Sequence, residues 1–370
     1  MAGRTSIRTA FDAVQRSIPG AEFAEWEGWE CIAGFGDAEA EHHAVRQACG
    51  VWDESPLQKW DLQGPDALLA ADRFFTNDMR SLQVGQLRYG AFCDDAGRML
   101  GDGIAFRLAG DRLRLVTALE SDGQAFVEAA GEADYQLERV TDRWPHLQVQ
   151  GPDSRTVIQS LTDADLGALG YYRFLPEPVA VAGVRVMLAR CGYSGELGYE
   201  LYCAPGDAEQ LWGALLSTGR VRPYGLNAVE TLRQEAGLIF LGYDYFPART
   251  DPFEMNLDRV VRLDKPWFRG QEALRALAGR TPRRLTTLVL DGDEVPSYGA
   301  SVLRDGALVG EVRSPSTSPT VGRVIAMSVL DAGLIELGAR FEVELDSGGL
   351  ASATCGTYPL YDPAKLHPRS

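Results

Sequence analysis

The pattern of apolar and polar positions divides the chain into short helices and strands. From Asp37 to Cys49 the composition favours a helix, with an aspartate placed to cap its start and Gly50 placed to end it. The segment from Lys59 to Gln63 is typical of a strand. Apolar residues near a helical period predict two further helices, over 206–218 and 224–240.

The motif Gln-Gly-Pro-Asp occurs twice, and each copy stands between a strand-like run and a helix-like run. The copies start at residues 63 and 150, 87 positions apart. Glycine turns the chain, proline suits the first helical turn, and aspartate favours the positive end of a helix. Two β–α units at this distance indicate an internal pseudo-repeat. The alternative is that the motif is simply a common way to enter a helix, and the sequence leaves both open.

Antiparallel strands are predicted between the two copies of this motif. Tyr89 to Phe92 is followed by hairpin residues at 94–97 and by a second strand from Met99 to Phe106. Leu113 to Thr117 continues the series. Because helices and antiparallel strands alternate here, we expect an α+β fold.

The composition changes near residues 278–284, which are polar and rich in turn residues. Beyond them, short alternating or β-branched runs predict a small all-β domain, either a barrel or a sandwich. We therefore divide the chain into residues 1–280 and 281–370. The predicted strands of the second part are Leu285–Leu290, Ser301–Leu303, Ala307–Val312, Val321–Met327 and Phe341–Leu345.

Composition and charge narrow the class of protein. The 370 residues are 45% hydrophobic and 24% charged, as in an ordinary globular protein, and the net charge is −16. An acidic surface repels nucleic acid and anionic membrane, so neither is expected as a partner. The first twenty residues contain no apolar signal segment, and no apolar run approaches the ~20 residues of a membrane span. We expect a cytoplasmic protein.

Cysteine and histidine usage gives no metal site. The six cysteines form no CxxC pair, and the four histidines lack an HExxH spacing. We expect reduced structural thiols and no bound metal.

The densest candidate for chemistry is the stretch from Arg190 to Glu200. It holds three glycines within seven residues, which let backbone approach a ligand, and two tyrosines that offer flat surfaces to a ring. Glu196 and Glu200 can accept hydrogen bonds from adjacent ring N–H groups. The alternative is a glycine-rich hairpin with solvated carboxylates.

A second candidate is Asp102, which lies between two glycines in a predicted strand. A carboxylate there is poorly explained as core, and it is either a turn residue or an acid/base group held in a pocket. A third candidate is the loop at 242–254, for which a site-lining role and a plain surface role are equally open. No GxxxxGK[ST], GxGxxG or GxSxG motif is present, which weakens nucleotide-binding, Rossmann and α/β-hydrolase interpretations.

Four stretches, in order and at similar spacing, resemble one known family. They are Glu41 to Asp53 (EHHAVRQACGVWD), Arg190 to Tyr202 (RCGYSGELGYELY), Gly225 to Gly242 (GLNAVETLRQEAGLIFLG) and Thr250 to Leu274 with its DPFE and WFRGQEAL. They resemble the T-protein (aminomethyltransferase) family of the glycine cleavage system, which also includes tetrahydrofolate-dependent demethylases. The resemblance extends from about Phe23 to Lys365.

The resemblance implies a three-subdomain cloverleaf with a C-terminal β-barrel and with tetrahydrofolate in a central channel. It implies that Asp102 is the catalytic aspartate and that Glu200 grips the pterin. Further residues that we assign to cofactor binding on the same basis are Leu57, Tyr89, Arg233 and Tyr361, with Tyr358 as the alternative to Tyr361.

This chain departs from the family pattern at two positions that bear on the reaction. Gly101 stands where the family has the first aspartate of a pair, and Val229 stands where aminomethyltransferases have a folate-contacting arginine. These departures resemble the demethylase side of the family, so a lipoyl carrier protein is not expected as a partner.

The resulting hypothesis is a demethylase that moves a methyl group from a small O-, S- or N-methyl substrate to N5 of tetrahydrofolate. An ether donor would need a proton for its leaving group, and Tyr193 or Tyr243 would supply it. The alternatives are an aminomethyltransferase-like enzyme giving 5,10-methylenetetrahydrofolate and a non-catalytic folate-binding protein. The last is disfavoured because Trp267 stands at the position of the cysteine in that branch's KGCYxGQE motif.

Overall fold

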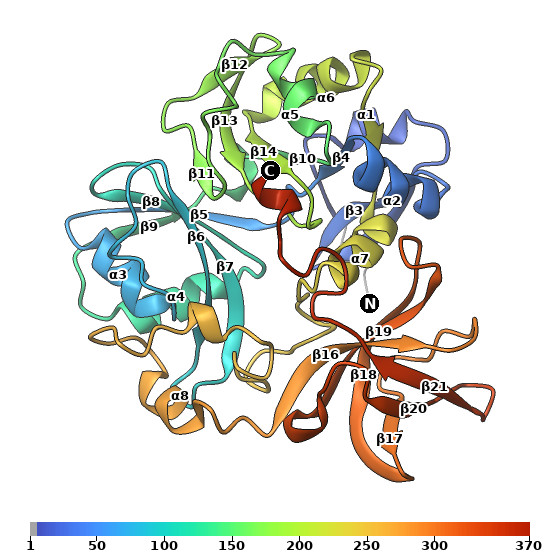
Figure 1. Cartoon of the computed structure of the whole chain (residues 1–370). Helices are drawn as coiled ribbons and strands as arrows, with labels where there is room; N and C mark the ends of the chain where they lie inside the picture. Colours follow the sequence, from blue (N-terminus) through green and yellow to red (C-terminus); the bar gives the residue numbers. More distant parts are fainter. Residues whose placement is uncertain (1–5) are drawn as a thin grey trace.

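The computed structural model describes residues 6–370, and it arranges them as three lobes around a common centre (Figure 1). Two lobes are built on open sheets flanked by helices, and the third is a closed barrel. The α+β class and the C-terminal β-barrel predicted from the sequence are confirmed. Residues 1–5, which belong to the stretch in which no signal segment was expected, lie outside the described part.

The first lobe is a seven-stranded sheet in the order β11-β13-β14-β10-β4-β15, with β12 paired to β13. Helices α1, α5 and α6 bury apolar side chains such as Phe11, Val157 and Trp212 against one face of this sheet. A three-stranded sheet, β1-β3-β2, lies beside it with α2 and α7. The bounds are β1 Ile7–Arg8, α1 Asp12–Arg16, β2 Glu22–Trp26, β3 Trp29–Gly34, α2 Ala38–Gln47, β4 Gly50–Asp53, β10 His146–Gln150, α5 Ser154–Gln159, β11 Arg173–Phe174, β12 Val179–Val181, β13 Val184–Arg190, β14 Gly198–Tyr202, η2 Pro205–Asp207, α6 Ala208–Ser217, β15 Arg222–Pro223 and α7 Leu226–Glu235.

The second lobe is a five-stranded sheet in the order β6-β7-β8-β5-β9. Helices α3 and α4 cover one face, where Phe74 and Phe126 join the apolar core. The opposite face contributes Leu87 and Phe106 to a second cluster shared with Tyr202 of the first lobe. The bounds are β5 Gln58–Gln63, α3 Ala67–Phe74, β6 Leu87–Cys93, β7 Met99–Arg107, β8 Arg112–Thr117, α4 Asp122–Ala130, β9 Gln136–Arg139 and η1 Thr141–Arg143.

The third lobe is a barrel closed in the order β16-β19-β18-β17-β20-β21. A segment containing η3 and α8 leads into it, and a final segment leaves β21 and returns to the first lobe, where η5 lies near β14 (Figure 1). The bounds are η3 Asp258–Val260, α8 Gln271–Leu277, β16 Arg283–Leu290, β17 Ser301–Arg304, β18 Ala307–Ser318, β19 Arg323–Asp331, η4 Ala332–Leu334, β20 Arg340–Glu344, β21 Leu350–Cys355 and η5 His367–Arg369.

Most of the predicted elements are present. Both Gln-Gly-Pro-Asp motifs join a strand to a helix, β5 to α3 in one lobe and β10 to α5 in the other, which supports the pseudo-repeat. The prediction of a helix over 224–240 is wrong in extent. The helix ends at Glu235 because Gly237 adopts a left-handed φ of 62°, which a continuing helix does not allow. Strand β21 was not predicted.

All six cysteines are buried and free of disulfides, as predicted. Among residues 6–370, no helix has both the length and the apolar character needed to cross a membrane.

One buried carboxylate, that of Glu235 at the end of α7, connects two lobes. It accepts hydrogen bonds from Arg46 of α2, with Nη2 at 2.9 Å, and from Thr320 Oγ1 of the barrel at 2.8 Å. Ser318 Oγ also donates to it, and His42 Nε2 lies 3.4 Å away. Burial opposes ionisation, but the hydrogen bond with His42 and the charge of Arg46 outweigh it and lower the pKa of Glu235 to about 2.

We predict that Glu235→Gln lowers the free energy of unfolding by roughly 3 kcal/mol, because it leaves the buried Arg46 with less compensating charge. The folded pKa lies below the ordinary value of 4.5, so the wild-type contribution is present above pH 4.5 and is lost as the pH falls toward about 2. Urea unfolding measured from pH 7 to pH 3 checks both statements. Glu39→Gln, at a side chain that is 75% exposed, is the matched control. An unchanged urea midpoint in the Glu235 variant contradicts the prediction.

Candidate functional site

A cavity of about 1160 Å³ lies where the three lobes meet. Strand β7 of the second lobe, β14 of the first and β16 of the barrel all contribute to its wall. Of the residues predicted from the sequence, five line it, as does Tyr358, the alternative to Tyr361, whereas Arg233, Tyr361 and Tyr243 do not. The five are Leu57, Tyr89, Asp102, Tyr193 and Glu200.

Asp102 projects into this cavity from β7. Strands β6 and β7 pair so that Ala91 stands opposite Asp102, which places Tyr89 and Asp102 on the same face of the sheet. The Tyr89 hydroxyl donates a hydrogen bond to Asp102 Oδ2 at 2.8 Å. The Tyr245 hydroxyl, 143 positions away in sequence, donates to Oδ1. Each carboxylate oxygen is therefore held by one tyrosine.

The surroundings of Asp102 set its protonation. Burial raises its pKa, and the hydrogen bonds from Tyr245 and Tyr89 act against that increase because they stabilise the charged form. The pKa values of both tyrosines are raised well above the ordinary value, first by burial and then by the charge of Asp102. The two hydroxyls therefore stay protonated as donors, and the carboxylate is suited to accept a proton.

Gly101 has a steric explanation. A Cβ atom at this position would lie 2.5 Å from the ring of Phe92, which is fully buried. The first aspartate of the family pair therefore does not fit beside this phenylalanine, and Asp102 is the carboxylate that remains.

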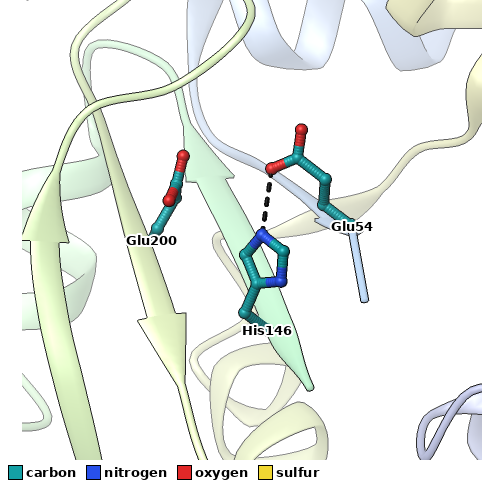
Figure 2. A group of neighbouring side chains, drawn as sticks. All are labelled: Glu54, His146 and Glu200. Atoms are coloured by element: carbon teal, nitrogen blue, oxygen red, sulfur yellow. Dashed lines mark hydrogen bonds and ion pairs between the residues drawn. The ribbon is translucent and has the colours of Figure 1, made fainter. Parts of the chain in front are cut away.

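A second polar group surrounds Glu200 on β14, and its members were not predicted as neighbours of this glutamate. The Tyr202 hydroxyl donates to Glu200 Oε2 at 2.6 Å, and the Tyr202 ring stacks on His146 with centroids 4.4 Å apart. His146 Nε2 lies 3.1 Å from Glu54 Oε2, as Figure 2 shows, and Gln148 also donates to that oxygen. Both glutamates line the cavity.

These buried groups perturb one another's ionisation. Burial raises the pKa of Glu54 and that of Glu200, and for Glu54 the charge of Glu200 adds to the effect. Burial also lowers the pKa of His146 well below its usual value and that of Lys59 to about 7. The imidazole is thus neutral, and the two carboxyl groups disfavour simultaneous ionisation.

The donor atoms of Glu54, His146 and Glu200 lie within 4.8 Å of one another, a spacing that also suits a metal ion. His146 Nε2 and Glu54 are already in hydrogen-bond contact. The burial and mutual arrangement of the three side chains equally suit the N–H groups of a heterocyclic ring.

The glycine-rich stretch packs on a side chain rather than opening a path to a ligand. A Cβ atom at Gly192 or Gly198 would lie 2.1 or 2.2 Å from the Gln150 amide. That amide donates to the Cys191 carbonyl at 3.2 Å and accepts from Ser194 Oγ at 2.7 Å. The hairpin is therefore rigid, and it presents Tyr193 to the cavity.

Leu57 and Tyr193 provide two further parts of the wall. Leu57 packs with Ile104 and Tyr172 against the cluster between the two sheets. The Tyr193 hydroxyl donates to the carbonyl oxygen of Ile239, and burial raises the pKa of Tyr193 well above its usual value.

Arg233 is fully buried, and its guanidinium is already occupied. It donates to Glu230, to the Leu238 carbonyl, to Ser314 Oγ at 2.9 Å and to Asp244 Oδ2 at 2.6 Å. Asp244 directly precedes Tyr245, so this ion pair fixes the loop that carries the second tyrosine to Asp102. A direct contact between Arg233 and the cofactor stays a prediction, and in this arrangement every N–H group of the guanidinium is already used in a hydrogen bond.

The two late tyrosines differ in position. Tyr358 lines the cavity and donates its hydroxyl to the Gly237 carbonyl at 3.0 Å. Tyr361 instead covers the guanidinium of Arg46, with the ring centroid at 3.9 Å, and hydrogen-bonds His367. Of the two candidates for the late aromatic position, Tyr358 has the better geometry.

Four residues of the site, His146, Gln148, Glu54 and Tyr245, were not predicted from the sequence, although a local pattern indicated two of them. In β10 the residues His146, Gln148 and Gln150 are polar at every second position, while Leu147 and Val149 between them are apolar. All five are buried, so the polar side chains face an enclosed polar space. That alternation was sufficient to indicate His146 and Gln148. Glu54 and Tyr245 carried no comparable local signal.

Comparison with known proteins identifies the family. A family model described as the GCVT N-terminal domain matches residues 14–265. A second, described as the glycine cleavage T-protein C-terminal barrel domain, matches residues 283–362.

Relatives cover nearly the whole chain. An aminomethyltransferase of Streptomyces avermitilis is 39% identical over 344 residues, which are 90% of this chain and 91% of that protein. A trimethylamine-oxide aldolase of Ruegeria pomeroyi is 36% identical over 94% of this chain and 46% of its own length. The crystal structure of the glycine cleavage system aminomethyltransferase T from Bartonella henselae has a TM-score of 0.88 at 25% identity and covers 96% of this chain and 98% of that one. The chain belongs to the glycine cleavage T-protein (aminomethyltransferase) family of tetrahydrofolate-dependent one-carbon transferases.

Proposed function

We propose that this chain is a demethylase that transfers a methyl group from a small O-, S- or N-methyl substrate to N5 of tetrahydrofolate. The observation that carries the proposal is the Asp102 carboxylate, held by two tyrosine hydroxyls at the wall of a cavity of about 1160 Å³. Pockets for a single small molecule usually measure about 300–1,000 Å³. This cavity has room for a cofactor and a small substrate together.

The polar group around Glu200 fits the pterin ring of the cofactor. A pterin presents an amide N–H and an amino group side by side, and a carboxylate accepts from both. Glu200 would accept these N–H groups, with Tyr202 holding its other oxygen and Glu54 as a second acceptor. Leu57 and Tyr89 supply apolar and aromatic surface nearby. When bound, tetrahydrofolate supplies the nucleophilic nitrogen that receives the methyl group.

Asp102 would act on the charge that develops during transfer. The methyl carbon gains a bond to N5 as its bond to the leaving atom breaks, and the leaving atom keeps the electron pair. Asp102 then takes the proton released from N5, a role suited to a carboxyl group whose pKa is raised by burial. Tyr89 and Tyr245 fix the orientation of both oxygens, so that no reorganisation is needed at the moment of reaction.

The choice among ether, sulfonium and ammonium donors depends on whether Tyr193 or Tyr243 can protonate the leaving group. Tyr193 has a raised pKa and already donates to Ile239, so it is a weak proton donor. Tyr243 is 47% exposed and is not part of the cavity wall. A sulfonium or ammonium donor leaves as a neutral molecule and needs no acid. Because neither tyrosine is placed to protonate an ether's leaving group, we favour S- or N-methyl donors over ethers, in keeping with a relative named for trimethylamine oxide.

Aminomethyl transfer to give 5,10-methylenetetrahydrofolate is the second candidate. It is favoured by relatives named aminomethyltransferase, such as those of Streptomyces avermitilis and Lysinibacillus sphaericus. Against it, Val229 is buried with Val45 and Trp52 in an apolar cluster at the position of the folate-contacting arginine. A lipoyl carrier protein is therefore not part of the proposal.

Incubating the protein with tetrahydrofolate and a panel of methyl donors tests the proposal directly. The panel holds sulfonium, betaine, N-methylglycine and aryl-ether compounds, in the absence of oxygen, and the folate products are identified by mass spectrometry. We expect a 5-methyl product with a sulfonium or N-methyl donor. A 5,10-methylene product instead moves the chain to the aminomethyltransferase side.

We predict that Asp102→Asn lowers turnover by roughly 10²-fold or more while tetrahydrofolate affinity stays within a few-fold, because the amide cannot take a proton. Tyr245→Phe is the companion variant. It keeps the carboxylate but removes a donor to its charged form, so the pKa of Asp102 rises and the acid limb of the pH–rate profile moves to higher pH. Full activity in Asp102→Asn removes this residue from the mechanism.

We predict that Glu200→Gln weakens tetrahydrofolate binding by about tenfold or more, since charge-assisted hydrogen bonds are lost in a buried site. Fluorescence or calorimetric titration measures the affinity, and Glu39→Gln again serves as an exposed control. Equal affinity in the Glu200 variant and the wild type rules out the pterin-binding role.

A further inference from the structure

Three cations gather at one opening of the central cavity. Arg259 of η3 and Arg369 of η5 are exposed, Lys365 between them is half-buried, and all three line the cavity. We call these three residues the cationic mouth. Because two of them face both solvent and cavity, they mark a point where the cavity opens.

The final segment of the chain builds this mouth. It is anchored on the first lobe, where Arg155 donates to the Ser370 carbonyl at 2.6 Å and Arg190 donates to the same oxygen. Arg369 folds back and donates to the Lys365 carbonyl at 2.9 Å, and its guanidinium lies 6.0 Å from the ring centroid of Tyr171. Figure 1 shows this segment crossing from the barrel to the first lobe, over the centre of the molecule.

Within the described part of the chain, no member of the cationic mouth forms an ion pair with an acidic side chain. Across residues 6–370, none of its three members lies within 4 Å of an acidic side chain. Two acids lie nearby: Asp258 pairs with Arg284 at 2.7 Å, and Asp362, which accepts from the His367 amide, acts on Lys365 through its negative charge alone. Burial and the charges of Arg259 and Arg369 lower the pKa of Lys365 to about 8.

Such a cluster is unexpected in a protein of net charge −16. Three mutually repelling cations cost folding free energy unless an anion lies among them. The flat face of Tyr171 beside Arg369, and of Tyr358 on the same cavity wall, would cover an organic anion that enters here.

We infer that the cationic mouth is a carboxylate-binding subsite for a reactant that occupies the central cavity. The inference rests on the proposed function for the identity of the reactants, and two of them can bring the carboxylate. One source is the glutamyl tail of tetrahydrofolate, and the other is a carboxylate carried by the methyl donor. The shared chemistry is an extended molecule whose charged end stays at the opening while its reactive end reaches Asp102.

The test compares the wild-type chain with the double variant Arg259→Gln/Lys365→Gln. The matched control is Arg185→Gln/Arg280→Gln, two exposed cations that are outside the cavity wall and form no ion pair with the described residues. Titration with tetrahydrofolate and with 6-methyltetrahydropterin, which carries no carboxylate, gives the cofactor arm. Steady-state kinetics with dimethylsulfoniopropionate and trimethylsulfonium, or with betaine and tetramethylammonium, give the substrate arm.

If the tail of the cofactor binds here, the double variant loses about tenfold in tetrahydrofolate affinity and nothing in 6-methyltetrahydropterin affinity. If the donor carboxylate binds here, KM rises about tenfold for the carboxylated donor only, with kcat nearly unchanged. In both cases the wild-type interaction weakens with added salt and that of the double variant does so less. Either pattern supports the subsite.

Stability separates a binding role from a structural one. The ligand-free double variant should be as stable as the wild type or more stable, because like-charge repulsion is removed, whereas a structural role requires it to be less stable. Unchanged affinities, KM values and salt dependence overturn the inference. The cofactor arm needs only binding, so the absence of any methylated product would count against the proposed function and leave the test of the mouth intact.

Discussion

The packing of the first lobe against the barrel depends on one buried ionised carboxylate. Glu235 stands at the end of α7, and its partners come from α2 and from the barrel. Beside it, Arg46 also reaches the Ser194 carbonyl and Glu196 in the hairpin that presents Tyr193, and it supports the ring of Tyr361. A charge in this position is stable only while all partners are in place, so it makes the assembly of the lobes cooperative. The cavity exists because these lobes are held at a fixed spacing.

A second buried ion pair also holds parts of different lobes together, and it lies closer to Asp102. Arg233 and Asp244 are both fully buried, and Ser314 of the barrel joins them. The pair fixes the turn after α7, and the next residue, Tyr245, then reaches Asp102 on a different lobe. Removing the charge from Arg233 would therefore act on the reaction through the position of a tyrosine. The family resemblance assigned Arg233 to the site. Its contacts in the structure are needed to tell whether it binds the cofactor or positions another residue.

Local features of the fold were predictable from the sequence, and long-range ones were not. The helix α2, the two strand-turn-helix units and the hairpin around Asp102 follow from periodicity and turn chemistry, which act over a few residues. The end of α7 was misplaced because the apolar pattern continues past Gly237, although the helical conformation of the backbone ends before it. Asp102 and Glu200 were candidates from their local sequence, and the resemblance assigned their roles, whereas neither route indicated Tyr245 or Glu54. Their partners lie 143 and 92 positions away, and no local pattern records such a pairing.

The distribution of charge along the cavity completes the account of how an acidic protein can hold an anionic cofactor. Its interior contains carboxyl groups whose pKa values are raised by burial, so they carry less negative charge than their number implies. Its opening carries the three cations of the cationic mouth, none of which forms an ion pair within the described part of the chain. An anion is thus attracted at the mouth, while a ring with N–H donors is accepted deep inside, and a molecule with both ends is oriented before any specific contact forms. The same gradient would draw a cationic methyl group toward Asp102, where the remaining negative charge lies closest to the proposed reaction. The electrostatic field of the cavity and the hydrogen bonds of its wall therefore favour the same orientation of the cofactor and the methyl donor. That agreement helps to hold the two reactants in line.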